Sequence, residues 1–150
     1  MLNYFKENNL MHYPSKQPEN WEEAIRISCE KLVENNYITE SYIDEIIDSV
    51  YEYGPYIVIV PQVAMPHAKP DNPGVLDTGI SFTKFPREVN FVDLNKNEVL
   101  PATLFFTLAA KNSDEHLKNI MELMELLNDE EMIPKLLETN SLKDYKKLLK

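Results

Sequence analysis

The apolar and polar positions of this chain alternate between helical and extended patterns along its length. Residues 1 to 19 mix both kinds of side chain around Pro14 and Pro18, which predicts a short helix or extended segment and then a loop. From an Asn20 N-cap to about Asn35, apolar residues recur every three to four positions, which predicts a helix.

A second helix is expected between a Thr39 N-cap and the stop signal Gly54-Pro55. Strands are expected next. Residues 56 to 60 form a continuous apolar run, mostly β-branched, that is typical of a strand buried on both faces. Residues 78 to 85 also have a strand pattern, and 89 to 91 predict a shorter strand. Residues 101 to 110 are the most strand-like and predict the middle of the sheet.

The C-terminal part of the chain predicts three helices. The first is expected to have Ser113 as its N-cap and an inner face that includes Leu117, Met121 and Met124. The others cover about 129 to 137 and 141 to 149, the last with a capping box that begins at Ser141. Helices that flank several strands imply one domain over residues 1–150, an α/β sandwich in which a mixed β-sheet is flanked by helices.

Composition limits the classes of protein to consider. Hydrophobic residues make up 43% of the chain, but no apolar run approaches the roughly 20 residues that span a bilayer. The first residues do not resemble a signal peptide, so we expect a cytoplasmic protein without direct membrane insertion. Cys29 is the only cysteine, which excludes an internal disulfide and a cysteine-based zinc cluster; it is interpreted as a core residue.

The net charge of the chain indicates which kind of partner it can bind. The chain has 25 acidic and 15 basic residues, which argues against nucleic acid because phosphates require a basic surface. A basic protein is the better partner, although the excess acid can equally serve solubility alone. Three scattered glycines form no phosphate-binding loop, so no nucleotide cofactor is expected.

Two histidines are the candidates for chemistry. His67 follows a strand in a loop bounded by prolines, and Pro66 restricts the backbone on both sides of itself. His116 falls in the first turn of a helix that also follows a strand, where the helix dipole favours an anion. Strand ends of α/β sheets gather ligand sites, so the two side chains could share one site. From spacing alone, His116 is better explained as a solvated residue, because helix termini commonly carry polar side chains.

Several motifs in order resemble one family. They are Gly54-Pro55-Tyr56-Ile57-Val58-Ile59, Ala64-Met65-Pro66-His67-Ala68, Gly74-Val75, Thr78-Gly79-Ile80-Ser81-Phe82, Trp21-Glu22-Glu23-Ala24-Ile25 and Asp114-Glu115-His116. The chain is similar over nearly its whole length to the enzyme IIA components of the sugar phosphotransferase system (PTS), type 2, the mannitol/fructose superfamily. It resembles the ascorbate-type branch most closely.

This resemblance implies a phosphorelay protein in sugar uptake, with ascorbate as the sugar of the branch. Family members accept a phosphoryl group from the phosphohistidine of the carrier protein HPr and pass it to a cysteine of a cognate enzyme IIB. The match places His67 on the phosphorylated histidine and His116 on a second active-site histidine that stabilises the transferring group. Hydrogen-bond donors at the first turn, including Ser113, would hold its oxygens. No metal or other cofactor is needed.

One departure from the family concerns an arginine. Mannitol- and fructose-type relatives carry an active-site arginine upstream of the histidine, whereas this chain has Tyr51-Glu52-Tyr53 there. The ascorbate-type branch shares this absence. Lys69 is therefore a candidate substitute for binding the phosphoryl group.

Two other classes of function remain as alternatives. One is a regulatory module, in which phosphorylation of the same histidine reports sugar flux to a partner. The other is a metal-binding protein with His67, His116 and Asp77 as ligands. The oligomeric state is open as well, since the two final helices could pack within the monomer or in a homodimer.

Overall fold

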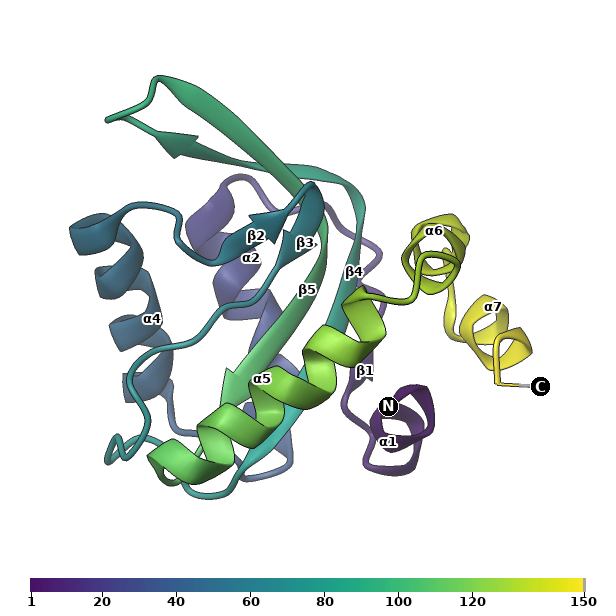
Figure 1. Cartoon of the computed structure of the whole chain (residues 1–150), viewed down its shortest axis with the longest axis horizontal. Coiled ribbons are helices and arrows are strands. Elements are labelled where there is room, and N and C mark those ends of the chain that lie inside the picture. The colour runs from purple at the N-terminus through teal and green to yellow at the C-terminus, as the bar shows by residue number, and fades with distance from the viewer. Residues whose placement is uncertain (150) are drawn as a thin grey trace.

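The computed structural model describes residues 1–149, in which a five-stranded sheet lies between helices (Figure 1). The strands run in the spatial order β1-β4-β5-β3-β2. β1 is parallel to β4 and β3 is parallel to β5, whereas the other neighbours are antiparallel. The sheet is therefore mixed, as predicted, and β5 lies at its centre. The strands are β1 (Met11–His12), β2 (Val58–Val60), β3 (Gln62–Ala64), β4 (Gly79–Asp93) and β5 (Glu98–Ala109).

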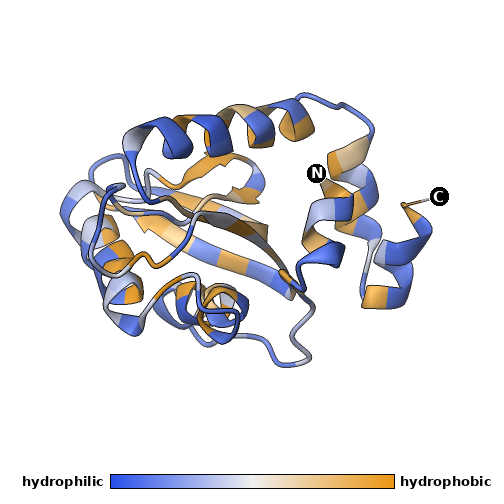
Figure 2. Ribbon diagram, turned by 90° about the horizontal axis from the view of Figure 1, so that it is seen from below, coloured by the Kyte–Doolittle hydropathy of each residue, from blue (hydrophilic) through white to orange (hydrophobic). Residues whose placement is uncertain are grey.

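The helices form layers on both faces of the sheet. α5 runs along one face, and α2 and α4 cover the other, as the two views show (Figures 1 and 2). α1, α6 and α7 gather at one end of the molecule. None of the helices in the described part of the chain is long and apolar enough to cross a membrane. The helices are α1 (Leu2–Glu7), α2 (Trp21–Ser28), α3 (Glu30–Glu34), α4 (Glu40–Tyr53), α5 (Ser113–Leu127), α6 (Met132–Glu138) and α7 (Leu142–Lys147).

Two of the predicted side-chain caps are present. The Asn20 side chain accepts a hydrogen bond from the Glu23 N–H at 2.8 Å, and Ser141 accepts one from the Asp144 N–H at 3.2 Å. Each bond pairs an N–H that the helix itself leaves free, which stabilises the first turn. Thr39 also occupies a cap position, but its hydroxyl bonds to the Ser41 hydroxyl instead.

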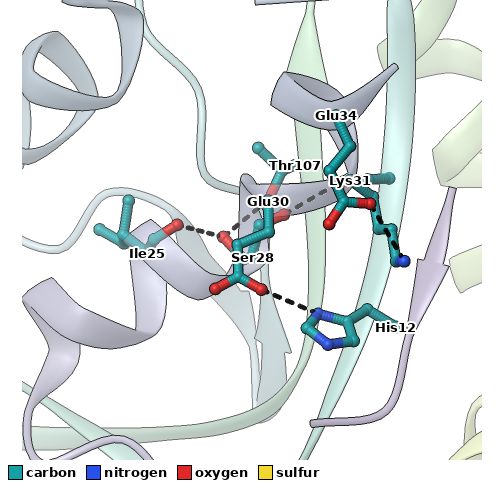
Figure 3. A network of polar contacts seen from close by, with 8 residues as sticks. His12, Ile25, Ser28, Glu30, Lys31, Glu34 and Thr107 are labelled. Atoms are coloured by element: carbon teal, nitrogen blue, oxygen red, sulfur yellow. Dashed lines mark hydrogen bonds and ion pairs between the residues drawn. The ribbon is translucent and has the colours of Figure 1, made fainter. Parts of the chain in front are cut away.

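The predicted helix from Asn20 to Asn35 is interrupted at Cys29 and divides into α2 and α3. Buried hydroxyls cluster at the break (Figure 3). The Ser28 hydroxyl donates to the Ile25 oxygen at 2.7 Å, Thr107 donates to that hydroxyl at 3.0 Å, and Ser81 donates to the Ser28 backbone oxygen at 3.0 Å. Side-chain bonds to the backbone compete with the helical ladder, and here they fasten the break to β4 and β5.

The predicted strand at residues 56 to 60 is not buried on both faces. Only residues 58–60 form a strand, β2, which lies at the edge of the sheet and pairs only with β3, and the side chains of Ile59 and Val60 are exposed by 37% and 43%. The chain turns at Pro61 and Gln62, where the Gln62 φ of 73° reverses its direction. An apolar run alone does not distinguish an edge from a central strand, which is why the short hairpin was missed.

The remaining strand predictions differ from the structure in where the strands begin and end. The two strands expected at 78 to 85 and 89 to 91 form one strand, β4, with a register shift between Lys84 and Val89. The predicted N-terminal segment contains the helix α1 and also β1, which pairs with Phe82 and Thr83.

Candidate functional site

Backbone hydrogen bonds fix the loop that carries His67 to β5 and to the segment before β2. The chain leaves β3 at Ala64, and the Met65 N–H then donates to the Ile57 oxygen at 2.8 Å. The Pro66 oxygen accepts from the Leu108 N–H of β5 at 2.9 Å. Because Pro66 also has a restricted φ, the backbone that enters His67 has one supported course.

Two tyrosines hold the loop beyond His67. The buried Tyr42 hydroxyl of α4 donates to the Leu108 oxygen at 2.7 Å and accepts from the Ala68 N–H at 3.2 Å. The Tyr56 hydroxyl donates to the backbone oxygen of His67 at 2.5 Å, and its ring meets the imidazole edge-on with the centroids 5.2 Å apart. His67 is therefore held from α4, from β5 and from the segment before β2.

The imidazole of His67 is held in one tautomer. Its Nδ1 lies 2.7 Å from the Met65 backbone oxygen, which can only accept, so Nδ1 carries the proton and Nε2 has a free lone pair. Burial lowers the pKa of His67, and this effect exceeds the opposing one of the Met65 hydrogen bond. A neutral imidazole with a free Nε2 is a nucleophile.

His116 lies next to His67. The ring centroids are 5.4 Å apart and the planes are inclined at 42°. Burial, and secondly the charge of His67, lower the pKa of His116, because two imidazolium ions would repel each other at this distance. The structure thus brings together the two histidines that the sequence placed separately at the ends of strands.

The N-cap of α5 is Asn112 and not Ser113. The Asn112 side chain accepts from the Glu115 N–H at 2.9 Å, and its backbone oxygen accepts from the His116 N–H at 3.0 Å. His116 therefore occupies the fourth helical position, whereas a Ser113 cap would have made it the third. Both residue types favour N-caps, so the composition of the turn did not decide between them.

A surface cavity of about 450 Å³ surrounds the two histidines. Lys69, proposed from the sequence, lies in its lining with an exposed side chain, whereas Ser113 is exposed and lies outside it. The sequence did not single out three polar residues of the lining, Ser49, Tyr53 and Tyr56, as site residues. Ser49 and Tyr53 are spaced i, i+4 on α4, which puts them on one helix face, and that spacing was the available signal. The full lining is Ser49, Tyr53, Tyr56, His67, Ala68, Lys69, Pro70 and His116.

Asp77 does not complete a metal site with the histidines. Among residues 1–149 no group of three or more histidine, cysteine or acidic side chains could hold a metal ion. The Asp77 carboxylate instead accepts a hydrogen bond from the Thr78 N–H at 2.8 Å. The metal-binding alternative thereby loses its ligand set.

The outer face of α5 beside His116 is apolar. Leu117, Met121 and Met124 were expected on the inner face, but they are exposed by 58%, 61% and 39%. The helix buries Leu123 and Leu126 instead, together with Asn119, whose amide donates to the Ala109 oxygen at 3.2 Å. Apolar residues of α5 occur on several sides of the helix, so their periodicity did not identify the face that is buried.

Similarity to known proteins extends over nearly the whole chain. The family model described as "Phosphoenolpyruvate-dependent sugar phosphotransferase system, EIIA 2" matches residues 4–150. The chain belongs to this family. It is an enzyme IIA component of the sugar phosphotransferase system, of the mannitol/ascorbate type.

Individual relatives support the same assignment of this enzyme IIA. The ascorbate-specific enzyme IIA component of Escherichia coli K12 is 34% identical over 80% of this chain and 76% of its own length. The solution structure of the mannitol-specific cryptic enzyme IIA of Escherichia coli has a TM-score of 0.81 and 36% identity, and the match covers 98% of this chain and 95% of that one. The mannitol enzyme IIA of Escherichia coli, solved in complex with phosphorylated enzyme IIB, has a TM-score of 0.73 and 28% identity over 92% of each chain.

Proposed function

We propose that this enzyme IIA relays a phosphoryl group through Nε2 of His67. The group arrives from the phosphohistidine of HPr and leaves to a cysteine of a cognate enzyme IIB. The main support for the proposal is that His67 and His116 lie side by side in one cavity. In addition, Nδ1 of His67 is hydrogen-bonded to the Met65 oxygen, which leaves Nε2 free.

The first transfer exchanges one phosphorus–nitrogen bond for another. The His67 Nε2 lone pair attacks phosphorus while the bond to the HPr imidazole breaks, and the electron pair of that bond stays on the HPr nitrogen. Phosphoryl transfer has a loose transition state, so the enzyme mainly supplies alignment and donors to the oxygens. The fixed tautomer of His67 supplies the alignment, because rotation of the ring would break the 2.7 Å bond to Met65.

The second transfer sends the group to sulfur. The cysteine thiolate of enzyme IIB attacks phosphorus, the bond to Nε2 breaks, and its electron pair returns to His67. Support for this partner comes from the mannitol relative, which was solved with phosphorylated enzyme IIB. It also comes from the exposed Leu117 and Met121 beside His116, since an apolar rim at a reactive site suits a protein partner.

His116 and Lys69 are proposed to bind the phosphoryl oxygens. Both side chains line the cavity with His67, and both can present N–H donors to an anion. Lys69 is the one cationic side chain of that lining, apart from the histidines themselves. It would supply the positive charge that the absent arginine supplies in mannitol- and fructose-type relatives.

Neither the identity of the sugar nor a regulatory role follows from the geometry of the site. Enzyme IIA contacts proteins and not the sugar, and the relatives are named for both mannitol and ascorbate. Ascorbate follows only from the branch that the sequence resembles. A regulatory module would use the same phosphohistidine, but it would not deliver the group to an enzyme IIB.

Intact-mass spectrometry tests the relay. The protein is mixed with phosphoenolpyruvate, enzyme I and HPr, beside the His67→Ala and His116→Ala variants. The proposal expects one acid-labile phosphate on the wild type, none on His67→Ala and slow uptake by His116→Ala. Addition of enzyme IIB should then remove the phosphate. An unmodified wild type, under conditions that phosphorylate HPr, contradicts the relay.

A further inference from the structure

A second cavity, at the end of the molecule formed by α1 and α7, has a basic lining. Its volume is about 530 Å³, and its side chains come from α1, β1 and the residues that follow each of them, from α3, and from α7 and the segment before it. Three of them are lysines, Lys6, Lys31 and Lys146, and none is acidic. The chain as a whole has a net charge of −10, so the positive charge of this lining is opposite in sign to that of the whole protein. The full lining is Lys6, Asn9, Met11, His12, Tyr13, Lys31, Asn140, Ser141, Leu142 and Lys146.

Acidic side chains of the described residues pair with only part of this lining. Lys31 pairs with Glu34 at 3.2 Å, and Glu30 lies 3.7 Å from His12, as Figure 3 shows. Within residues 1–149, by contrast, neither Lys6 nor Lys146 has an ion-pair partner. Two unpaired ammonium groups at one concave surface repel each other, and a bound anion would relieve that repulsion.

Neutral donors and apolar surface complete this lining. Asn9, Asn140 and Ser141 offer amide and hydroxyl groups, while Met11 and Leu142 offer apolar contacts. A site that combines cations, neutral donors and apolar side chains binds a small organic anion better than an inorganic ion, because the organic part has surface to bury. Lysine binds phosphate well as a point charge.

We propose that this cavity binds a small organic phosphate through Lys6 and Lys146. The site is separate from the phosphorelay. None of its residues lines the cavity of His67, and α7 lies at the opposite side of the molecule from α4, which carries Ser49 and Tyr53 (Figure 1). Binding here does not depend on the proposed relay.

A titration of the ¹⁵N-labelled protein with glycerol 3-phosphate, followed by NMR, tests the site. Glycerol and inorganic phosphate serve as matched ligands. We expect saturable shifts of the His12 and Ser141 amides, weaker binding of inorganic phosphate and none of glycerol. The Lys6→Ala/Lys146→Ala double variant should bind at least about tenfold more weakly, because it loses two charge-assisted contacts. Both side chains are exposed, so the variant should fold as the wild type does.

Two control variants make the outcome specific. Lys143→Ala removes an exposed lysine of α7 that lies outside the lining and should bind as the wild type does. His67→Ala should also bind normally. Unchanged binding by the double variant, or shifts confined to the His67 loop and lost in His67→Ala, would overturn the proposal. Equal affinity for inorganic phosphate would do the same. If phosphatidylglycerol vesicles bind the wild type but not the double variant, while glycerol 3-phosphate does not bind, the lysines belong to a membrane contact and the proposal fails.

Discussion

Nδ1 of His67 lies 2.7 Å from the backbone oxygen of Met65, two residues before it in the chain. This contact fixes which nitrogen carries the proton, and it leaves Nε2 as the only nitrogen with a free lone pair. The hydrogen bonds of Pro66 and Ala68 hold the backbone on both sides of it. The nucleophile is therefore oriented before any partner arrives, which lowers the entropic cost of transfer.

The pH dependence of the site follows from the lowered pKa of His67. Burial disfavours the imidazolium, so the reactive neutral form should persist below pH 6.5, where a free histidine is largely protonated. NMR titration of the His67 ring should give a midpoint below 6.5, and phosphoryl uptake should decline only as the pH falls through that midpoint. A midpoint at or above 6.5 would show that burial does not set the pKa of His67.

The same shift predicts a loss of stability in acid. The unfolded chain keeps the ordinary pKa near 6.5 and binds the proton first, so the free energy of unfolding should decrease as the pH falls from 6.5 toward the folded midpoint. Urea unfolding of the wild type and His67→Gln across this range measures it. The variant should show a weaker dependence on pH, and an identical dependence would assign the effect to other groups.

Replacement of Lys69 by alanine should slow phosphoryl uptake from HPr. A charged donor to the phosphoryl oxygens contributes about 1.5–3 kcal/mol, so the rate should fall about tenfold or more. Lys118→Ala is the matched control, because Lys118 is exposed on α5 and lies outside the cavity lining. If Lys69→Ala relays at the wild-type rate, this lysine does not replace the arginine of related enzymes.

Tyr42→Phe should destabilise the protein and loosen the His67 loop. Its hydroxyl both donates to the Leu108 oxygen and accepts from the Ala68 N–H, and the side chain is only 1% exposed. Two buried backbone groups lose their partner, so we expect a loss of about 1–3 kcal/mol in urea unfolding. Tyr51→Phe, at an exposed tyrosine whose hydroxyl bonds to Glu22, should change stability by less than about 0.5 kcal/mol. Equal effects of both changes would contradict this account.

Gly74→Ala should also be destabilising, through a steric clash. A Cβ at Gly74 would lie 2.9 Å from the backbone nitrogen of Tyr42, at the start of α4. Backbone cannot move aside as a flexible side chain does, and such overpacking costs about 1–3 kcal/mol. Thermal unfolding should show a lower midpoint. An unchanged midpoint would mean that the loop before β4 adjusts freely.

The sequence predicted the layers and the two histidines better than it predicted their surroundings. β5 was placed at the centre of the sheet because its hydrophobic run is long, whereas the run at β2 is short and belongs to an edge. The position of His67 and His116 after strands allowed them to share one site, and the family resemblance implied that they do. Their actual contact depends on pairings such as Leu108 with Pro66, which no local pattern encodes. The prediction of the buried face of α5 was wrong for a related reason. Apolar residues occur on several sides of this helix, and tertiary packing decided that the side with Leu123 is buried.

NMR of the ¹⁵N-histidine-labelled phosphoprotein tests the central claim most directly, because it identifies the nitrogen that carries phosphorus. After phosphorylation by HPr, we predict a phosphorus coupling to Nε2 of His67, with Nδ1 still protonated against the Met65 oxygen. Phosphorus on Nδ1 of His67, or on His116, would contradict the account, since the geometry leaves Nε2 of His67 as the acceptor.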